Sequence, residues 1–270
     1  MIRKGVVLAA GKGSRLLPLT LAIPKEMIRV GTKPVIEHAL CALKAGGIRE
    51  ILIIVGRKKE AIMDYLGSGE RLGLEIYYRV QEEAKGTADA VHQSRDFVDR
   101  QDFVVIYGDN YFKPYRIMEE IIGFHVKKKA DSTLVLHATR DPRRFGVVKI
   151  DSDNRVTGVI EKPTLQEAED YRVGEGYLNI AGILVLGPLV FDFIERTKPG
   201  KDNEIWLTDS IELMRRSGHK VYGFTFKGTR FDIGTFESLL KADRLEQEER
   251  LRETTEETEG RSSRLDRLNP

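Results

Sequence analysis

Short runs of apolar, β-branched residues that alternate with amphipathic stretches constrain the fold of this chain most strongly. The runs are GVVLAA, EILIIVG, EIYYRV and DFVVIYGD, and the stretches between them include KPVIEHALCALKAG and TADAVHQSRDFV. Such runs predict buried strands, whereas apolar residues at helical spacing predict amphipathic helices. The alternation therefore predicts an α/β fold: a Rossmann-like, mixed and mostly parallel sheet with helices on both faces.

The pattern changes after Ala130. The segments STLVLHAT, FGVVKIDSDNRVTGVIEKP and YLNIAGILVLG are rich in β-branched residues, and Asp153-Asn154 is a hairpin-turn signal. We expect one domain over residues 1–245, made of a first half (about 1–130) and a β-rich second half (about 131–245). Residues 246–270 have mixed charge and no aromatic residue, so we expect a frayed helix that passes into a charged, partly disordered tail. A helix that contacts another subunit is the alternative.

The charge balance and hydropathy limit the classes of partner. The 44 basic and 42 acidic residues leave a formal net charge of +2, which favours neither nucleic acid nor an anionic membrane as a partner. The apolar run at Val6–Ala10 is too short for a signal peptide or an anchor, and no stretch of roughly 18 apolar residues occurs. We therefore expect a cytoplasmic protein that acts on small molecules.

The most specific motif is LAAGKGSRLLPLT, which is followed by IPKEM. Gly11 and Gly13 would let backbone N–H groups approach a triphosphate, because glycine has no Cβ. Arg15 and Lys25 would add positive charge, which lowers the barrier to phosphoryl transfer. Leu16 stands where a dinucleotide fingerprint has its third glycine, and no Lys-Ser/Thr pair follows, so neither Rossmann-type nor Walker-type binding is predicted.

This motif resembles the signature of the nucleotidylyltransferases that activate hexose 1-phosphates, including glucose-1-phosphate uridylyltransferases and thymidylyltransferases. The resemblance continues in order through Gln81, KGT at 85–87, GDN at 108–110, EKP at 161–163, WLTD at 206–209 and DIG at 232–234. It covers about residues 1–245. It implies the nucleotide-diphospho-sugar transferase fold. It also implies an in-line attack by a sugar phosphate on the α-phosphorus of a nucleoside triphosphate, with release of pyrophosphate.

The resemblance also implies a role for each matching residue. Asp109 and Asp232 would hold Mg²⁺, because two carboxylates from separate strand ends make the oxygen site that this ion prefers. Taken singly, Asp109 also fits a turn and Asp232 a helix N-cap. Arg15 and Lys25 would be the catalytic cations. The nucleotide would be bound by Leu8, Ala10, Gly11, Gly13, Gln81 and Gly86, and the sugar phosphate by Gly146, Glu161, Lys162 and Ile180.

Three of these side chains suggest specific contacts. The amide of Gln81 has a donor and an acceptor for a pyrimidine edge. Glu161 can accept hydrogen bonds from sugar hydroxyls, and Lys162 can pair with the phosphate. The attacking phosphate oxygen is already ionised near neutral pH, so no general base is required. The five histidines lack metal-ligand spacing, and we expect no catalytic role for them.

The identity of the substrates rests on finer features. Ala10 in LAAG and the segment AIPKEM are closer to the uridylyltransferase form, whereas GDN is closer to the thymidylyltransferase form. One methyl group distinguishes uracil from thymine and is worth about 1–3 kcal/mol. We expect UTP and glucose 1-phosphate, with dTTP as the alternative nucleotide. Two other hypotheses remain: a cytidylyltransferase for a sugar or polyol phosphate, and a non-catalytic subunit that senses nucleotide sugars. Members of this family commonly form dimers or tetramers, so the resemblance implies a homo-oligomer.

Overall fold

A mixed sheet runs through the centre of the computed structural model, which describes residues 2–200 and 203–265. Within the described residues nine strands form this sheet, in the order β10-β9-β11-β6-β1-β4-β5, and β8 pairs with both β11 and β12. The strands are β1 (Lys4–Ala9), β4 (Glu50–Val55), β5 (Glu75–Val80), β6 (Phe103–Tyr107), β8 (Ser132–Thr139), β9 (Gly146–Ile150), β10 (Val156–Glu161), β11 (Tyr177–Leu186) and β12 (Val221–Thr225). Two small sheets pair β2 (Arg29–Val30) with β3 (Lys33–Pro34) and β7 (Asn110–Lys113) with β13 (Thr229–Asp232).

The two halves of the sheet differ in strand direction, as the sequence predicts. In the first half β6, β1, β4 and β5 are parallel. In the second half β11 is antiparallel to β6, β8 and β9. The predicted hairpin turn joins β9 and β10, with Asn154 at φ 65° and Asp151 Oδ1 accepting hydrogen bonds from the Asp153 and Arg155 amides, both at 2.9 Å. The predicted fold class is confirmed.

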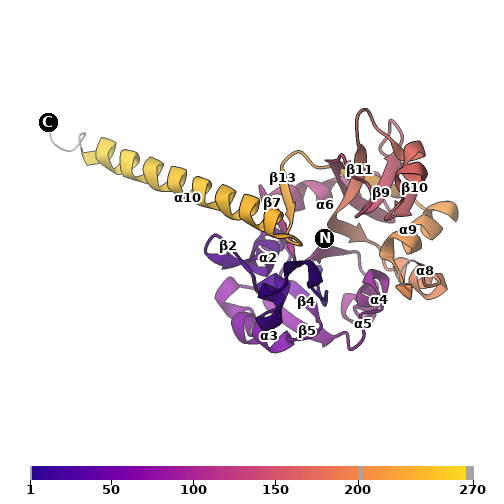
Figure 1. Cartoon of the computed structure of the whole chain (residues 1–270), viewed down its shortest axis with the longest axis horizontal. Coiled ribbons are helices and arrows are strands. Elements are labelled where there is room, and N and C mark those ends of the chain that lie inside the picture. The colour runs from indigo at the N-terminus through magenta and orange to yellow at the C-terminus, as the bar shows by residue number, and fades with distance from the viewer. Residues whose placement is uncertain (1, 201–202, 266–270) are drawn as a thin grey trace.

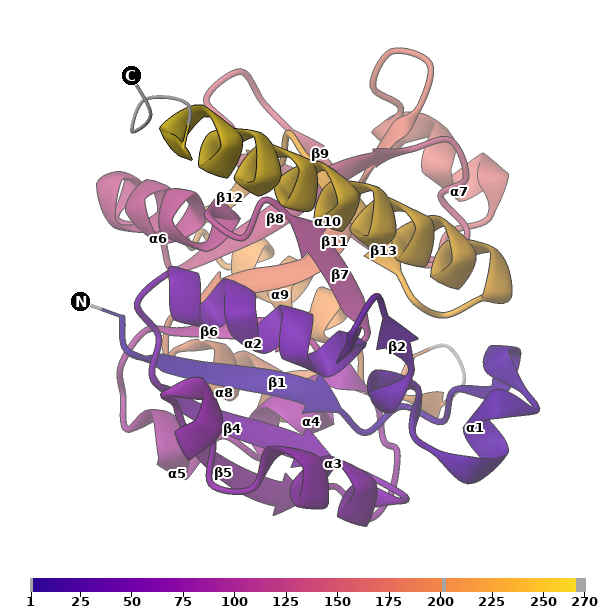
Figure 2. The ribbon, with the colours of Figure 1, turned by 90° about the vertical axis from the view of Figure 1, so that its left-hand side faces the viewer.

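Helices cover both faces of the sheet. They are α1 (Leu19–Ala22), α2 (Val35–Ala45), α3 (Lys59–Leu66), α4 (Thr87–His92), α5 (Arg95–Val98), α6 (Ile117–Lys128), α7 (Leu165–Ala168), α8 (Val190–Arg196), α9 (Leu207–Arg216) and α10 (Phe236–Leu265). Figure 2 shows α2 and α3 in front of the sheet and α4, α8 and α9 behind it. Side chains alternate along β1, so Val7 packs in the core under α2 and Val6 in the core under α8. No helix in the described ranges is long and apolar enough to cross a membrane.

One predicted helix is divided in two. The amphipathic stretch over residues 87–98 forms α4 and α5, with Ser94 between them. Ser94 is buried, and its hydroxyl donates a hydrogen bond to the Val91 carbonyl at 2.6 Å. This bond ends α4, because serine side chains compete for backbone groups that would otherwise continue a helix.

The C-terminal helix α10 starts on the body of the protein and then projects from it (Figure 1). Its first turns pack Leu239 and Ala242 beside Tyr111, whose hydroxyl donates a hydrogen bond to Glu246 Oε2 at 2.5 Å. Lys113 also lies 3.3 Å from Glu246. The domain boundary expected at residue 245 therefore falls inside one continuous helix, because these contacts continue past it. The end of the expected tail, residues 266–270, lies outside the described residues.

Candidate active site

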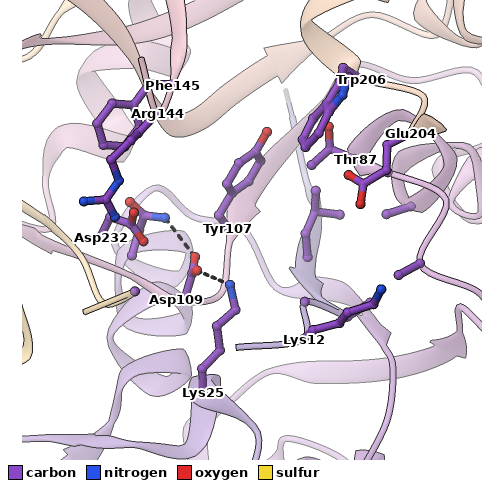
Figure 3. A pocket seen from close by; sticks show the side chains of 18 of the residues that line it. Lys12, Lys25, Thr87, Tyr107, Asp109, Arg144, Phe145, Glu204, Trp206 and Asp232 are labelled. Atoms are coloured by element: carbon purple, nitrogen blue, oxygen red, sulfur yellow. Dashed lines mark hydrogen bonds and ion pairs between the residues drawn. The ribbon is translucent and has the colours of Figure 1, made fainter. Parts of the chain in front are cut away.

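A cavity of about 390 Å³ opens where β1 and β6 end, between the two halves of the chain. Figure 3 views it from close by. Every site residue expected from the sequence lines this one cavity. These residues are Leu8, Ala10, Gly11, Gly13, Arg15, Lys25, Gln81, Gly86, Asp109, Gly146, Glu161, Lys162, Ile180 and Asp232. The fold thus gathers positions that are spread over more than 200 residues of sequence.

The glycine motif forms a loop between β1 and a short 3-10 helix, η1 (Ser14–Leu16). A Cβ atom on Gly11 would lie 2.9 Å from both Cε and Nζ of Lys25. Glycine at this position therefore makes room for the lysine to pass against the loop. Lys25 itself begins a second 3-10 helix, η2 (Lys25–Met27), directly after Pro24.

The ammonium group of Lys25 donates a hydrogen bond to Asp109, and Figure 3 shows the two side chains meeting. Asn110 Nδ2 donates to the other oxygen of Asp109, Oδ1, at 3.0 Å. Asp232 is brought near by the pairing of β13 with β7, which sets Asp232 opposite Asn110. The guanidinium of Arg15 lies 3.9 Å from Asp232 Oδ2. The two predicted catalytic cations thus each face one of the two predicted metal ligands.

Burial and neighbouring charges shift the pKa values of this group in consistent directions. Burial alone would raise the pKa of Asp109, but the Lys25 ammonium, together with the charge of Arg230, holds that pKa below its usual value. Burial raises the pKa of Asp232, and the charge on Asp109 raises it further. Burial alone would lower the pKa of Lys25, but Asp109 and Glu26 outweigh it and the pKa rises. Asp109 is therefore ionised and Lys25 protonated. Additional positive charge near Asp232 would stabilise its ionised form.

The donor set at this point suits Mg²⁺. The described part of the chain contains no cluster of three or more His, Cys, Asp or Glu side chains that could hold a metal ion. Mg²⁺ takes only one or two carboxylates from a protein and completes its shell with phosphate oxygens and water. Burial and then the charge of Asp109 raise the pKa of Asp232, and a cation between the two carboxylates would offset both effects.

On the nucleotide side, the orientation of the Gln81 amide follows from its neighbours. Gln81 is 7% exposed, and its Nε2 donates to Asp89 Oδ2 at 2.6 Å and to the Gly86 carbonyl at 3.3 Å. Both partners are acceptors only, so the nitrogen rather than the oxygen must face them. The group that Gln81 offers a ligand is therefore its carbonyl oxygen, Oε1.

The backbone conformation and close packing at position 86 require glycine. Its φ is 109°, and a Cβ there would lie 2.4 Å from the Ile205 carbonyl oxygen. That oxygen accepts a hydrogen bond from the Ala88 amide at 3.0 Å. We expect Gly86→Ala to lower the free energy of unfolding by at least about 2 kcal/mol, measured by urea denaturation.

The matched control is Gly123→Ala in α6, where an added Cβ would meet nothing within 4 Å. Alanine favours helices more than glycine does, so this variant should be unchanged or more stable by about 0.5–1 kcal/mol. Equal stability of the two variants would contradict the close contact at Gly86.

On the sugar-phosphate side, Glu161 ends β10 opposite Gly146 of β9. Its Oε2 accepts a hydrogen bond from the Thr208 hydroxyl at 2.6 Å. Lys162 follows at φ 41°, and its ammonium lies 3.9 Å from the centre of the Trp206 ring. A cation over the face of an indole is attracted to the ring. Trp206 therefore helps to hold Lys162 at the wall of the cavity.

The cavity wall also includes residues to which the sequence analysis assigned no role. Arg230 is the clearest: its Nε donates to Asn110 Oδ1 at 2.8 Å, and its guanidinium lies 5.3 Å from the centre of the Phe145 ring. It precedes Asp232 by two residues on β13, so both point to the same side of the strand. The two-residue spacing from Asp232 on an expected strand is the sequence signal that could have identified Arg230 as a cavity residue. Others are Lys12, Glu26, Thr87, Tyr107, Arg144, Phe145, Glu204, Trp206 and Thr208.

Comparison with known proteins adds independent findings. A family model described as "Nucleotidyl transferase" matches residues 4–249. The low-salt glycan biosynthesis nucleotidyltransferase Agl11 of Haloferax volcanii is 35% identical over 243 residues, and the glucose-1-phosphate thymidylyltransferase of Streptomyces griseus is 30% identical over 242. Each match covers 90% of this chain and 65% of the relative, so the chain spans about two thirds of their length.

A solved structure is also similar. The crystal structure of UDP-glucose pyrophosphorylase complexed with UDP-glucose superposes with a TM-score of 0.82 at 25% sequence identity. The superposition covers 92% of this chain and 100% of that one. The likeness thus includes both halves of the chain.

Proposed function

This chain belongs to the nucleotidyl transferase family, within the group that acts on sugar 1-phosphates, and we propose that it transfers a uridylyl group from UTP to glucose 1-phosphate. The products are UDP-glucose and pyrophosphate. The observation that carries the proposal is the single cavity that the glycine loop, both cations, both aspartates and the Glu161-Lys162 pair line together. Relatives named for thymidylyl transfer make dTTP the alternative donor.

The geometry supports an in-line displacement at the α-phosphorus. A phosphate oxygen of the sugar 1-phosphate forms the new bond to the α-phosphorus, and the bond from that phosphorus to the bridging oxygen breaks, so pyrophosphate leaves with the electron pair. Lys25 and Arg15 would stabilise the charge that builds on the phosphate oxygens. Asp109 and Asp232 would hold Mg²⁺, which supplies further charge neutralisation when bound. Glu161 would orient the sugar by accepting hydrogen bonds from its hydroxyls. Lys162, held by the Trp206 ring, would orient the phosphate.

Gln81 supports a uracil or thymine base over cytosine. Its Nε2 is occupied by Asp89 and Gly86, so Oε1 remains to meet the base as an acceptor. Uracil and thymine have an N–H donor at position 3, whereas cytosine has an acceptor there. A buried acceptor facing an acceptor leaves both groups without a hydrogen bond. This contact favours UTP or dTTP over CTP.

A substrate matrix tests the function. UTP, dTTP, CTP, ATP and GTP would each be incubated with a panel of sugar 1-phosphates and Mg²⁺, with pyrophosphate release as the readout. We expect the highest kcat/KM for UTP with glucose 1-phosphate and loss of the reaction with a chelator. Preference for CTP would establish the cytidylyltransferase instead. Binding of nucleotide sugars without any turnover would establish the sensing subunit.

Lys162 gives a prediction about the sugar phosphate. We expect Lys162→Ala to raise the KM for the sugar 1-phosphate about tenfold or more, because a charge-assisted contact with the phosphate is lost. The KM for the triphosphate should stay within about twofold. Initial rates with each substrate varied in turn measure both. Lys149→Ala is the control, since this exposed lysine lies on the neighbouring strand β9. A shift confined to the triphosphate KM would refute the assignment.

The form of α10 supports a further proposal, that the protein is a homo-oligomer. Its later turns extend away from the body of the subunit (Figure 1), where a second copy can reach them. We expect a dimer or tetramer in solution, and a smaller assembly when the chain ends at residue 250. Light scattering measures both masses, and a monomeric full-length chain would refute the proposal.

A further inference from the structure

Glu26 is a buried carboxylate to which the proposed reaction gives no role. It lies in η2 beside Lys25, lines the cavity and is only 1% exposed. Among the described residues, neither of its side-chain oxygens has a hydrogen-bond partner. Burial raises the pKa of Glu26 to about 7. A buried carboxylate without a partner is costly, so its presence calls for an explanation other than stability.

The surroundings of Glu26 place it under the catalytic loops. A Cβ on Gly11 would lie 4.0 Å from Glu26 Oε1, and one on Gly108 would lie 3.4 Å from Glu26 Cγ. Glu26 therefore sits between the glycine loop and the turn that presents Asp109. Its ionic neighbour is the ammonium of Lys25, at 3.9 Å from Oε1. Lys25 thus stands between two carboxylates and contacts only Asp109 directly.

Asp109 has two incompatible uses. One of its oxygens, Oδ1, accepts from Asn110, and the other, Oδ2, accepts from Lys25. A divalent cation on Asp109 would compete with the ammonium for Oδ2 and repel it at short range. Lys25 would then have to move, and a buried ammonium that leaves one anion needs another. Glu26 is the anion already beside it.

We propose that Glu26 is a positioning residue that receives the Lys25 ammonium when a divalent cation occupies Asp109. This inference rests on the metal site of the proposed function. Glu26 would hold Lys25 between the glycine loop and the cavity, where the lysine can face the α-phosphate. With Lys25 on Asp109, Glu26 has no hydrogen-bond partner within the described part of the chain.

A double-mutant cycle on metal affinity tests the proposal without substrates. The dissociation constant for Mn²⁺ alone would be measured by electron paramagnetic resonance for the natural chain, Glu26→Gln, Lys25→Met and the double variant. We expect Glu26→Gln to weaken Mn²⁺ binding about tenfold, because Lys25 then stays on Asp109. In the Lys25→Met background the loss should be at least about fivefold smaller, since there is no ammonium to relocate.

Other results would overturn the proposal in recognisable ways. Equal losses in both backgrounds would make Glu26 a metal ligand itself, and no loss in either would remove its role. Glu204→Gln, which deletes a carboxylate elsewhere on the cavity wall, controls for the lost charge. If Mn²⁺ binds neither the natural chain nor any variant, both the metal site and the role of Glu26 are refuted. The proposed reaction is tested separately by the substrate matrix.

Stability and steady-state kinetics separate a positioning role from a structural one. Glu26→Gln should leave the free energy of unfolding unchanged or higher, because no hydrogen bond is lost and the cost of burying a carboxylate offsets the lost attraction to Lys25 at 3.9 Å. Its kcat should fall while the KM for glucose 1-phosphate stays within about twofold. A variant that is less stable but normal in kcat would show that Glu26 only supports the fold.

Discussion

Lys25→Met is expected to lower kcat by about 100- to 1,000-fold while the protein stays folded. Lys25 lines the cavity and contacts Asp109 beside the glycine loop. Losing one group that stabilises charge in a transition state typically costs this much. Methionine keeps most of the methylene stem that packs against Gly11, so the loop should keep its place. The measurement is kcat at saturating substrates, with circular dichroism to verify folding.

The control for this variant is Lys12→Met. Lys12 also lines the cavity but is exposed and lies away from Asp109 (Figure 3). Exposed charges contribute little because water screens them, so its effect on kcat should be less than about tenfold. Similar losses in both variants would mean that only the total positive charge of the loop matters. Near-normal turnover of Lys25→Met would refute its catalytic role.

Asp109→Asn is expected to lower kcat by about 1,000-fold or more. The substitution keeps the shape of the side chain, but it removes the negative charge that Lys25 and the proposed Mg²⁺ share. Metal binding contributes several kcal/mol of charge stabilisation in such reactions, and each 1.4 kcal/mol is a factor of ten. The rate of pyrophosphate release should be measured over a wide range of Mg²⁺ concentration.

The dependence on Mg²⁺ separates the two variants. Asp109→Asn should need much more Mg²⁺ for half-maximal rate, whereas Lys25→Met should not, because it keeps both carboxylates. The matched control is Asp64→Asn on α3, an exposed position outside the cavity, which should behave as the natural chain. An unchanged Mg²⁺ requirement in Asp109→Asn would exclude Asp109 as a ligand.

Local sequence patterns predicted most of the secondary structure, because strands and helices leave different periodicities. The buried runs over residues 50–55 and 103–107 are strands as predicted, and the amphipathic stretch KPVIEHALCALKAG contains the predicted helix, Val35–Ala45. The division of the helix at Ser94 was missed, since it depends on one side-chain hydrogen bond. A helix at the start of the charged tail was expected and is present in α10, but its anchoring was not predicted, because it depends on contacts of Glu246 with distant Tyr111 and Lys113.

The residues expected from the sequence lie together in the structure, but their contacts were not predicted. Every expected site residue lines the cavity. Local chemistry suggested Gly11, Gly13, Arg15 and Lys25, whereas the resemblance to the nucleotidylyltransferases supplied the other positions. Glu26 was not singled out, since a glutamate between a lysine and a methionine gives no sign that it is buried. Only the structure shows that its buried carboxylate lacks a hydrogen-bond partner among the described residues.

The sequence by itself determined the elements and the chemical groups of this protein: alternating buried strands and amphipathic helices, a glycine loop, two cations and two aspartates. Only the tertiary structure decided which groups meet. Lys25 reaches Asp109 across 84 residues, and Asp232 reaches the same place because β13 pairs with β7 in one register. The direction of the Gln81 amide depends likewise on Asp89. Strand register and side-chain packing between distant segments set such contacts, and local patterns do not contain them.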